Sequence, residues 1–287
     1  MEFRTVHTVD EAVDVLADEG DDARILAGGT DVMIQHLRGE IHTDLLLHVA
    51  RVAALEGVAH GERLRLGSLT RHRRIATDDA IRQHAPALAQ AAATVGGWQT
   101  QAVGTIGGNV CNASPAADTV PPLLVADATV TLASRRGGRS LPIADFIVGR
   151  REVDRRPDEL LIDLELELLP PLSAEIYLKV SPRRAMEVAL VGLAVRLTLG
   201  ADGTSVADVR IAACAVGPRP FRAHAAEAVL RGCRLEAERI AEAGALLTDQ
   251  ASPIDDARAS ARYRRRVLAP LLARALDRCR RAAAGGD

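Results

Sequence analysis

Two glycine-rich stretches decide the expected fold: Ala27-Gly28-Gly29-Thr30-Asp31 and Gly104-Thr105-Ile106-Gly107-Gly108-Asn109. Because glycine has no Cβ, backbone N–H groups in such a loop can come close to a ligand. The first stretch directly precedes an expected helix, and the free N–H groups at a helix start favour a phosphate. Two such loops from different strands could hold both ends of a pyrophosphate, which predicts a dinucleotide site.

A plainer interpretation is also open, since a single Gly-Gly pair is most often a turn and composition does not name the ligand. Neither loop fits G-x-G-x-x-G, and the sequence has no G-x-x-x-x-G-K-[ST] or G-x-S-x-G, so a Rossmann site, a nucleoside triphosphatase and a catalytic triad are disfavoured. The eight histidines lack metal-ligand spacing and the four cysteines form no C-x-x-C pair. This spacing predicts neither a zinc site nor an iron–sulfur cluster.

Composition excludes several classes of partner. The formal charge of -2 predicts no attraction to nucleic acid or to an anionic membrane. No segment reaches the about 18 apolar residues that span a bilayer, and the N-terminus does not resemble an export signal. We therefore expect a cytoplasmic protein with reduced thiols. Its 287 residues suggest two domains.

The order of expected elements indicates an α+β protein. Thr8-Val9-Asp10-Glu11 reads as a capping box, in which Thr8 and Glu11 satisfy each other's backbone N–H groups, and this helix should end at Gly20. Strands are expected at residues 24–27, 44–50, 62–69, 128–133 and 159–168, with helices after Asp31 and at 70–76 and 80–95.

Pro170-Pro171 is the expected domain boundary, which gives domains at residues 1–171 (lobes of about 1–55 and 56–171) and 172–287. The second domain should hold strands at 175–180, 187–199 and 206–216, then helices at 222–231, 236–247 and 256–281. Pro270 should kink or split the last helix, because proline removes an N–H donor.

At the glycine loops the sequence resembles the FAD-binding medium subunit of the xanthine dehydrogenase and aerobic carbon monoxide dehydrogenase family, which are molybdenum hydroxylases. The second loop continues in the family pattern through Ser114-Pro115-Ala116-Ala117-Asp118. Tyr177-x-Lys179 with Arg183-Arg184, and later Ser260-Ala261-x-Tyr263-Arg264-Arg265, resemble the family's C-terminal part. The resemblance implies a two-lobed FAD-binding domain of the PCMH/VAO-like type, followed by a small antiparallel sheet with a helical bundle.

The same resemblance assigns residues to FAD. The first loop would wrap the pyrophosphate with its N–H groups, and the second would approach from the other side with Thr105 adding a hydroxyl donor. Asn112 and Asp118 would bond the ribityl, ribose or pyrophosphate region, and Leu161 would contact a ring system. Lys179 would lie near the flavin pyrimidine edge, where a cation stabilises the negative charge of the reduced ring. The full set of expected cofactor-binding residues is Ala27, Gly28, Gly29, Thr30, Asp31, Val32, Thr105, Gly107, Gly108, Asn112, Asp118, Leu161 and Lys179.

The resemblance also implies partners: a large molybdopterin-binding subunit and a small 2Fe-2S subunit. Electrons from the iron–sulfur clusters would pass through FAD to NAD⁺, oxygen or a quinone. Two alternatives stay open, a free-standing FAD-dependent NAD(P)H oxidoreductase and a structural assembly subunit that has lost the cofactor.

Overall fold

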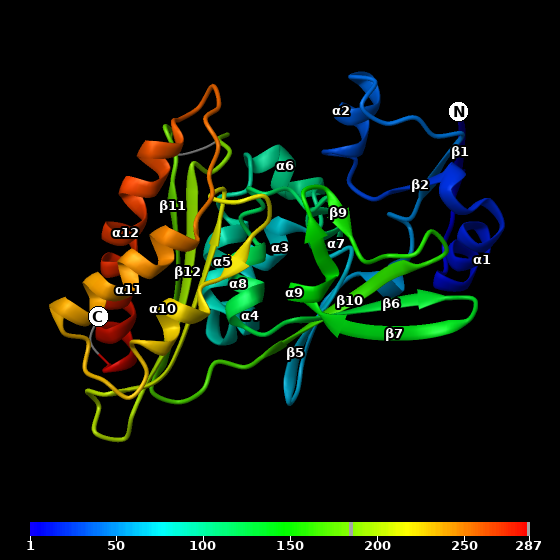
Figure 1. Cartoon of the computed structure of the whole chain (residues 1–287). Helices are drawn as coiled ribbons and strands as arrows, with labels where there is room; N and C mark the ends of the chain where they lie inside the picture. The colour runs from blue at the N-terminus through cyan, green and yellow to red at the C-terminus, as the bar shows by residue number, and fades with distance from the viewer. Residues whose placement is uncertain (184–185, 286–287) are drawn as a thin grey trace.

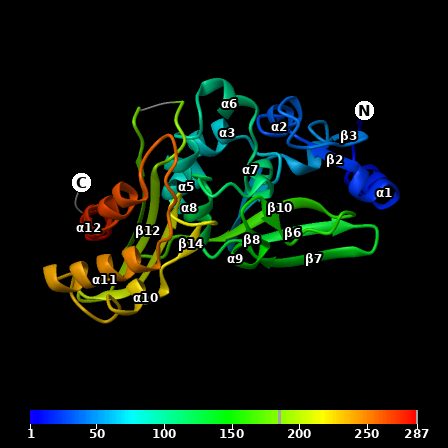
Figure 2. The ribbon, with the colours of Figure 1, turned by 45° about the horizontal axis from the view of Figure 1, so that its top comes forward.

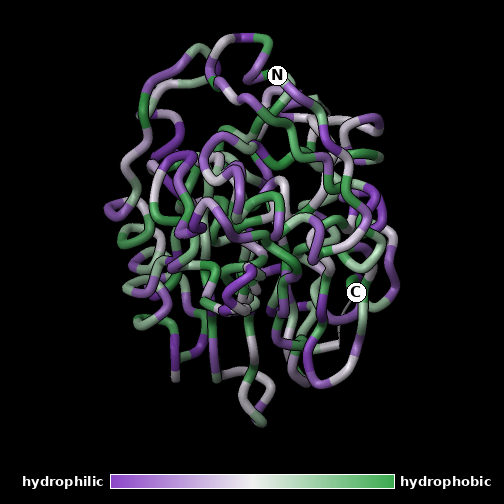
Figure 3. The backbone as a smooth tube through the Cα atoms, turned by 90° about the vertical axis from the view of Figure 1, so that its right-hand side faces the viewer, coloured by the Kyte–Doolittle hydropathy of each residue, from purple (hydrophilic) through white to green (hydrophobic). Residues whose placement is uncertain are grey.

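The computed structural model describes residues 1–183 and 186–285, and it has an α+β fold with three main sheets. Figure 1 shows the N-terminal lobe on one side, a central lobe, and the C-terminal sheet with its helices on the other side. Figure 3 shows hydrophobic and hydrophilic stretches alternating along the chain. This alternation lets each element turn its apolar residues toward a core.

The N-terminal lobe is a parallel sheet in the order β1-β3-β2, packed with one long helix and one short helix. Its elements are β1 (Glu2–Thr5), α1 (Val9–Glu19), the 3-10 turn η1 (Gly20–Asp22), β2 (Ala23–Leu26), α2 (Val32–Leu37), β3 (Leu45–His48) and η2 (Ala53–Leu55). The predicted end of α1 at Gly20 is confirmed, since Gly20 is its C-cap with φ 57°.

The predicted capping box at α1 is half right. Thr8 Oγ1 accepts from Glu11 N at 3.1 Å. The Glu11 carboxylate, however, accepts from the backbone N–H of His7 at 2.7 Å instead of that of Thr8. The carboxylate therefore reaches one residue beyond the N-cap.

The central lobe is an antiparallel sheet in the order β4-β5-β10-β6-β7, surrounded by short helices. Its strands are β4 (Val58–His60), β5 (Arg63–Gly67), β6 (Thr129–Ser134), β7 (Gly137–Pro142) and β10 (Leu160–Glu167), with a small ribbon of β8 (Ile147–Gly149) and β9 (Glu152–Val153). Its helices are α3 (His72–Thr77), α4 (Asp79–His84), α5 (Pro86–Ala92), α6 (Trp98–Val103), α7 (Ile106–Asn112), α8 (Val120–Val125) and α9 (Ile143–Phe146).

One helix predicted over residues 80–95 is wrong, because two helices occupy this stretch. Pro86 starts α5 at its first turn, and Ala85 before it has the non-helical angles φ -144° and ψ 56°. A proline disfavours helical angles in the preceding residue but fits the first turn of a new helix.

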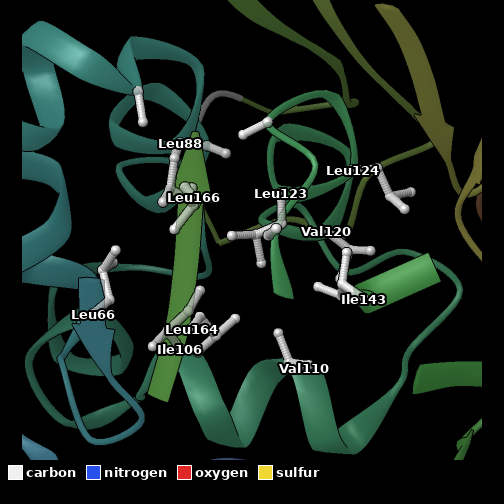
Figure 4. Packing of buried hydrophobic residues seen from close by; sticks show 14 of the residues in the cluster. Leu66, Leu88, Ile106, Val110, Val120, Leu123, Leu124, Ile143, Leu164 and Leu166 are labelled. Carbon is white, nitrogen blue, oxygen red and sulfur yellow. The ribbon is translucent and has the colours of Figure 1, made fainter. Parts of the chain in front are cut away.

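The core of the central lobe fixes the second glycine loop in place. Ile106 and Val110 of α7 are fully buried and pack with Leu164 of β10 and Leu123 of α8 (Figure 4). The apolar side of α7 thus anchors the helix to the sheet. The loop before the helix is held with it.

The C-terminal part is an antiparallel sheet in the order β11-β12-β13-β14. Its elements are β11 (Ser173–Val180), β12 (Val191–Leu199), β13 (Val206–Cys214), β14 (Phe221–Arg222), α10 (His224–Ala228), α11 (Ala237–Gln250) and α12 (Ala261–Ala283). Helix α12 packs on β11 and β12, and α11 packs on α12, while α5 and α8 of the central lobe contact the sheet from its other side (Figure 1).

Pro270 was predicted to kink or split the last helix; it does not split it, because α12 runs from Ala261 to Ala283. Pro270 lies on the exposed side of this helix. Water can therefore satisfy the carbonyl that loses its N–H partner. The helix was predicted to begin at residue 256 but begins at Ala261. The side chain of Ser260, the N-cap, accepts a hydrogen bond from the backbone N–H of Tyr263.

Candidate functional site

A cavity of about 760 Å³ lies where the two glycine loops meet. Its size is within the about 300–1,000 Å³ of small-molecule sites in proteins. Twelve of the thirteen predicted residues line it, all except Lys179: Ala27, Gly28, Gly29, Thr30, Asp31, Val32, Thr105, Gly107, Gly108, Asn112, Asp118 and Leu161. The structure thus brings both loops to one site, as the sequence predicted.

The first loop presents a run of free backbone donors. None of the five N–H groups of residues 28–32 donates a hydrogen bond to a described residue, although all five residues line the cavity. Successive unpaired N–H groups around a concave turn attract anions. The loop can therefore accept a phosphate group without first breaking bonds within the protein.

The glycine at position 28 also lets the two loops touch. A β-carbon built on Gly28 would lie 1.9 Å from the Val103 carbonyl oxygen and 3.1 Å from Gly104 N. No side chain fits in that space. The first loop therefore packs backbone against backbone on the residues that lead into the second loop.

The second loop is more fully bonded than the first. Gly107 N donates to Ser68 O at 2.8 Å, and Gly108 N donates to Thr105 Oγ1 at 3.1 Å, which makes Thr105 the N-cap of α7. The Thr105 hydroxyl proton is not donated to a described residue. The hydroxyl therefore remains a possible donor to a ligand, while the N–H groups of Gly107 and Gly108 are already used.

Asn112 connects the two lobes beside the cavity. Its amide nitrogen donates to Asp31 Oδ1 at 3.0 Å, and its amide oxygen accepts from Gln35 Nε2 at 2.9 Å. Burial raises the pKa of Asp31, although Arg151 and the Asn112 hydrogen bond oppose this. Asn112 thus holds the first loop in place from α7.

Asp118 sits at the wall of the cavity and is held from the C-terminal sheet. Tyr177 donates its phenolic O–H to Asp118 Oδ1 at 2.6 Å, and Lys179 Nζ lies 2.9 Å from Asp118 Oδ2. Burial raises the pKa of Asp118, and the Lys179 cation opposes this shift. Burial also raises the pKa of Tyr177 well above its usual value, so the phenol stays protonated and serves as a donor.

Lys179 lies behind Asp118 and does not line the cavity. Its side chain is only 8% exposed. Nζ donates to Asp118 Oδ2 and to two backbone oxygens, Thr94 O at 3.0 Å and Glu187 O at 2.9 Å. An ammonium group has three N–H donors, so all of them are used within the protein. Arg184, which belongs to the same sequence motif, lies outside the described residues.

Several cavity residues were not predicted from the sequence. Ser68 follows β5 directly and His72 begins α3, while Arg24 lies on β2 and Arg155 in the stretch after β9. Burial lowers the pKa of Arg24, and nearby Arg155 lowers it further. The Gly67-Ser68-Leu69-Thr70 turn at the end of a strand was the available signal for the first two residues. The arginines carry no local pattern.

No metal site or membrane helix is found among the described residues. They contain no group of three or more His, Cys, Asp or Glu side chains placed to bind a metal ion. No described helix combines the length and the apolar character that crossing a bilayer requires. Cys111 lines the cavity, but burial raises the pKa of its thiol to about 11, so it stays protonated.

Comparisons with known proteins identify the cofactor. A family described as the FAD binding domain in molybdopterin dehydrogenase matches residues 1–167, and the CO dehydrogenase flavoprotein C-terminal domain matches residues 176–279. The xanthine dehydrogenase FAD-binding subunit of Escherichia coli O157:H7 is 31% identical over 297 residues, which cover 99% of this chain and 98% of that protein.

Two solved structures share the whole fold. Carbon monoxide dehydrogenase from Hydrogenophaga pseudoflava superposes with a TM-score of 0.93 at 26% identity, covering 97% of this chain and 98% of that one. Quinoline 2-oxidoreductase from Pseudomonas putida 86 gives 0.92 at 26% identity, covering 99% and 98%. The two glycine loops, the cavity between them and these matches agree: the chain belongs to the family of FAD-binding medium subunits of molybdenum hydroxylases, and its cofactor is FAD.

Proposed function

We propose that this chain is the electron-transfer subunit of a heteromeric molybdenum hydroxylase. A large molybdopterin-binding subunit oxidises the substrate, and a small 2Fe-2S subunit delivers the electrons to this chain. The acceptor is NAD⁺, oxygen or a quinone. The proposal is supported by relatives whose names describe parts of larger enzymes, such as the medium chain of carbon monoxide dehydrogenase and a subunit of the 6-hydroxypseudooxynicotine dehydrogenase complex.

The free amides of residues 28–32 carry the assignment of the pyrophosphate site. We place the pyrophosphate between this loop and Thr105, whose hydroxyl proton is available to it. Asn112 keeps the first loop in position, and Asp118 and Leu161 contact the rest of the cofactor from the cavity wall. When bound, FAD supplies the redox chemistry, and the protein residues position it and set its potential.

Lys179 is proposed to act on the flavin through Asp118. Its ammonium group offsets the charge of the Asp118 carboxylate and fixes the carboxylate beside the cavity. It also fixes Glu187, another residue that lines the cavity, through the Glu187 carbonyl oxygen. Because the ammonium group offsets the Asp118 charge, the carboxylate should repel the reduced, more negative form of the cofactor less than an unpaired carboxylate would.

Exposed apolar side chains flank the cavity and fit a partner subunit. They are Ile34 and Leu37 on α2, 47% and 81% exposed, and Trp98 and Val103 on α6, 68% and 47% exposed. Both helices contribute residues to the cavity, and they lie along the same side of the molecule (Figure 2). Apolar residues gathered at a surface mark interaction sites, so we assign this apolar patch to the subunit that delivers electrons.

The test is reconstitution of the chain with FAD, alone and with the two partner subunits. We expect the chain alone to bind FAD and to oxidise no purine, aldehyde or CO. Addition of both partners should restore substrate-dependent reduction of the flavin, followed by its absorbance near the visible maximum. Turnover of an organic substrate by the chain alone would contradict the proposal. Rapid NADH oxidation by a monomer would instead support a free-standing reductase.

A further inference from the structure

His72 is a buried residue of the cavity wall that has no role in the proposed site so far. It is the first residue of α3, and its backbone N–H donates to Gly104 O at 3.0 Å. Its ring packs against the same glycine: a β-carbon on Gly104 would lie 3.1 Å from Cδ2 and 3.6 Å from Nε2 of His72. The imidazole therefore lies directly beside the start of the second glycine loop.

The imidazole lacks a hydrogen-bond partner among residues 1–183 and 186–285. Neither ring nitrogen bonds to another of these residues. Nδ1 is fully buried, and the whole residue is only 2% exposed. Burial lowers its pKa to about 4, so near neutral pH it is uncharged. A neutral imidazole carries one N–H donor and one acceptor nitrogen, and a buried polar group without a partner is costly.

The polar groups around the imidazole indicate what would satisfy it. Thr105, with its free hydroxyl proton, lines the same cavity, and so do the free amides of residues 28–32. All of these groups can donate to an anion. A neutral N–H donor can join them without needing a carboxylate to balance it when the ligand is absent.

We propose that His72 is a further cofactor-binding residue, whose imidazole N–H donates a hydrogen bond to a phosphate oxygen of the FAD pyrophosphate. This rests on the proposed position of the pyrophosphate between the two glycine loops. The ring then closes the side of the phosphate site formed by Gly104 and Thr105. The ligand then pairs the ring nitrogen that carries the N–H.

The test compares ligands that share only parts of FAD. The full-length chain and its His72→Leu and His72→Gln variants are titrated calorimetrically with FAD, with ADP, which has the pyrophosphate but no flavin, and with riboflavin, which has no phosphate. We expect His72→Leu to weaken FAD and ADP by about tenfold, the effect of one lost hydrogen bond, and to leave riboflavin unchanged. The Gln variant, which restores an N–H donor, should recover part of the loss.

The stability of the cofactor-free chain separates a binding role from a structural one. Because His72 has no described partner, His72→Leu should melt at or above the wild-type temperature without ligand. His60→Leu, an exposed change on β4 outside the cavity, is the control for loss of a histidine.

Each other outcome overturns a specific statement. Unchanged FAD affinity in His72→Leu rejects the role of His72, and an equal loss for riboflavin moves its contact to the flavin. A lower melting temperature without ligand, with FAD and ADP affinity kept, makes His72 structural. A wild-type chain that binds neither FAD nor ADP contradicts the pyrophosphate site itself, together with the role of His72.

Discussion

Gly28 packs so tightly beneath Val103 that a β-carbon on the glycine would lie 1.9 Å from the Val103 carbonyl oxygen. This contact joins the loop of the N-terminal lobe to the residues that lead into the loop of the central lobe. The backbone contact between Gly28 and Val103 therefore fixes the position of the two glycine loops relative to each other.

Replacing Gly28 with alanine should damage both the fold and the site. The added methyl group must push the loops apart, and overpacking of this kind costs about 1–3 kcal/mol. We expect a lower free energy of unfolding in urea and a weaker affinity for FAD. Gly61→Ala is the matched control, because a β-carbon there meets nothing within 4 Å. Wild-type FAD affinity in Gly28→Ala would show that the contact does not shape the cavity.

The Lys179–Asp118 pair should behave as a coupled unit. Lys179→Met leaves the buried Asp118 carboxylate without its cation, and breaking such a pair by removing one partner costs about 3–5 kcal/mol. Asp118→Asn in the same chain should recover much of that loss, because the uncompensated charge is gone. Urea unfolding of the two single variants and the double variant gives the coupling energy. Strictly additive losses would mean that the pair contributes nothing as a pair.

Asn112→Ala should weaken FAD binding and also lower the free energy of unfolding, because Gln35, only 6% exposed, loses its acceptor. It removes the hydrogen bonds to Asp31 and from Gln35 that hold the first loop. A loss of about 1 kcal/mol, roughly fivefold in Kd, is expected for the disordered loop. Quenching of Trp98 fluorescence by added FAD measures it, since the chain has only this tryptophan. Gln99→Ala, exposed and outside the cavity, should bind as the wild type does.

The free energy of unfolding of the cofactor-free chain should decrease as the pH is lowered, because of His72. Its pKa is about 4 in the folded chain against the ordinary 6.5, so between these values the unfolded chain binds more protons. Stability therefore rises with pH through this window and is lost as the pH falls below 6.5, by up to about 3 kcal/mol. His72→Leu should lose less stability than the wild type between pH 7 and pH 4.5, as urea unfolding would show. Parallel losses in both chains would contradict a neutral, buried His72.

The apolar patch should be needed for assembly and not for the cofactor. Leu37→Ser and Trp98→Ser should weaken binding of the iron–sulfur partner by about tenfold or more if these are central contacts. FAD content, measured from the visible spectrum, should not change. Ile254→Ser, at a residue 67% exposed against 68% for Trp98 and placed between α11 and α12, should leave assembly unaffected. Intact assembly of both patch variants would move the partner to another surface.

Short-range patterns in the sequence predicted the helix ends and the two glycine loops, because these features depend on residues that are neighbours in the chain. The cap at Thr8 and the stop at Gly20 are such patterns. Local rules failed where surroundings decide, as at the exposed Pro270, which does not split α12. The acceptors of Lys179 at Thr94 and Glu187 are backbone oxygens from distant segments, so no spacing rule could find them. The solitary His72 likewise gains its meaning only from the folded chain.

The hold of Tyr177 and Lys179 on Asp118 has a consequence for recombining natural relatives. Asp118 comes from one half of the gene and its two companions from the other, so the halves are not interchangeable parts. A chimera that joins the front of one flavoprotein to the back of another must inherit all three as a set. Otherwise the Asp118 carboxylate would lack the two side chains that hold it. In a library of such hybrids, the folded members should therefore keep Asp118, Tyr177 and Lys179 together.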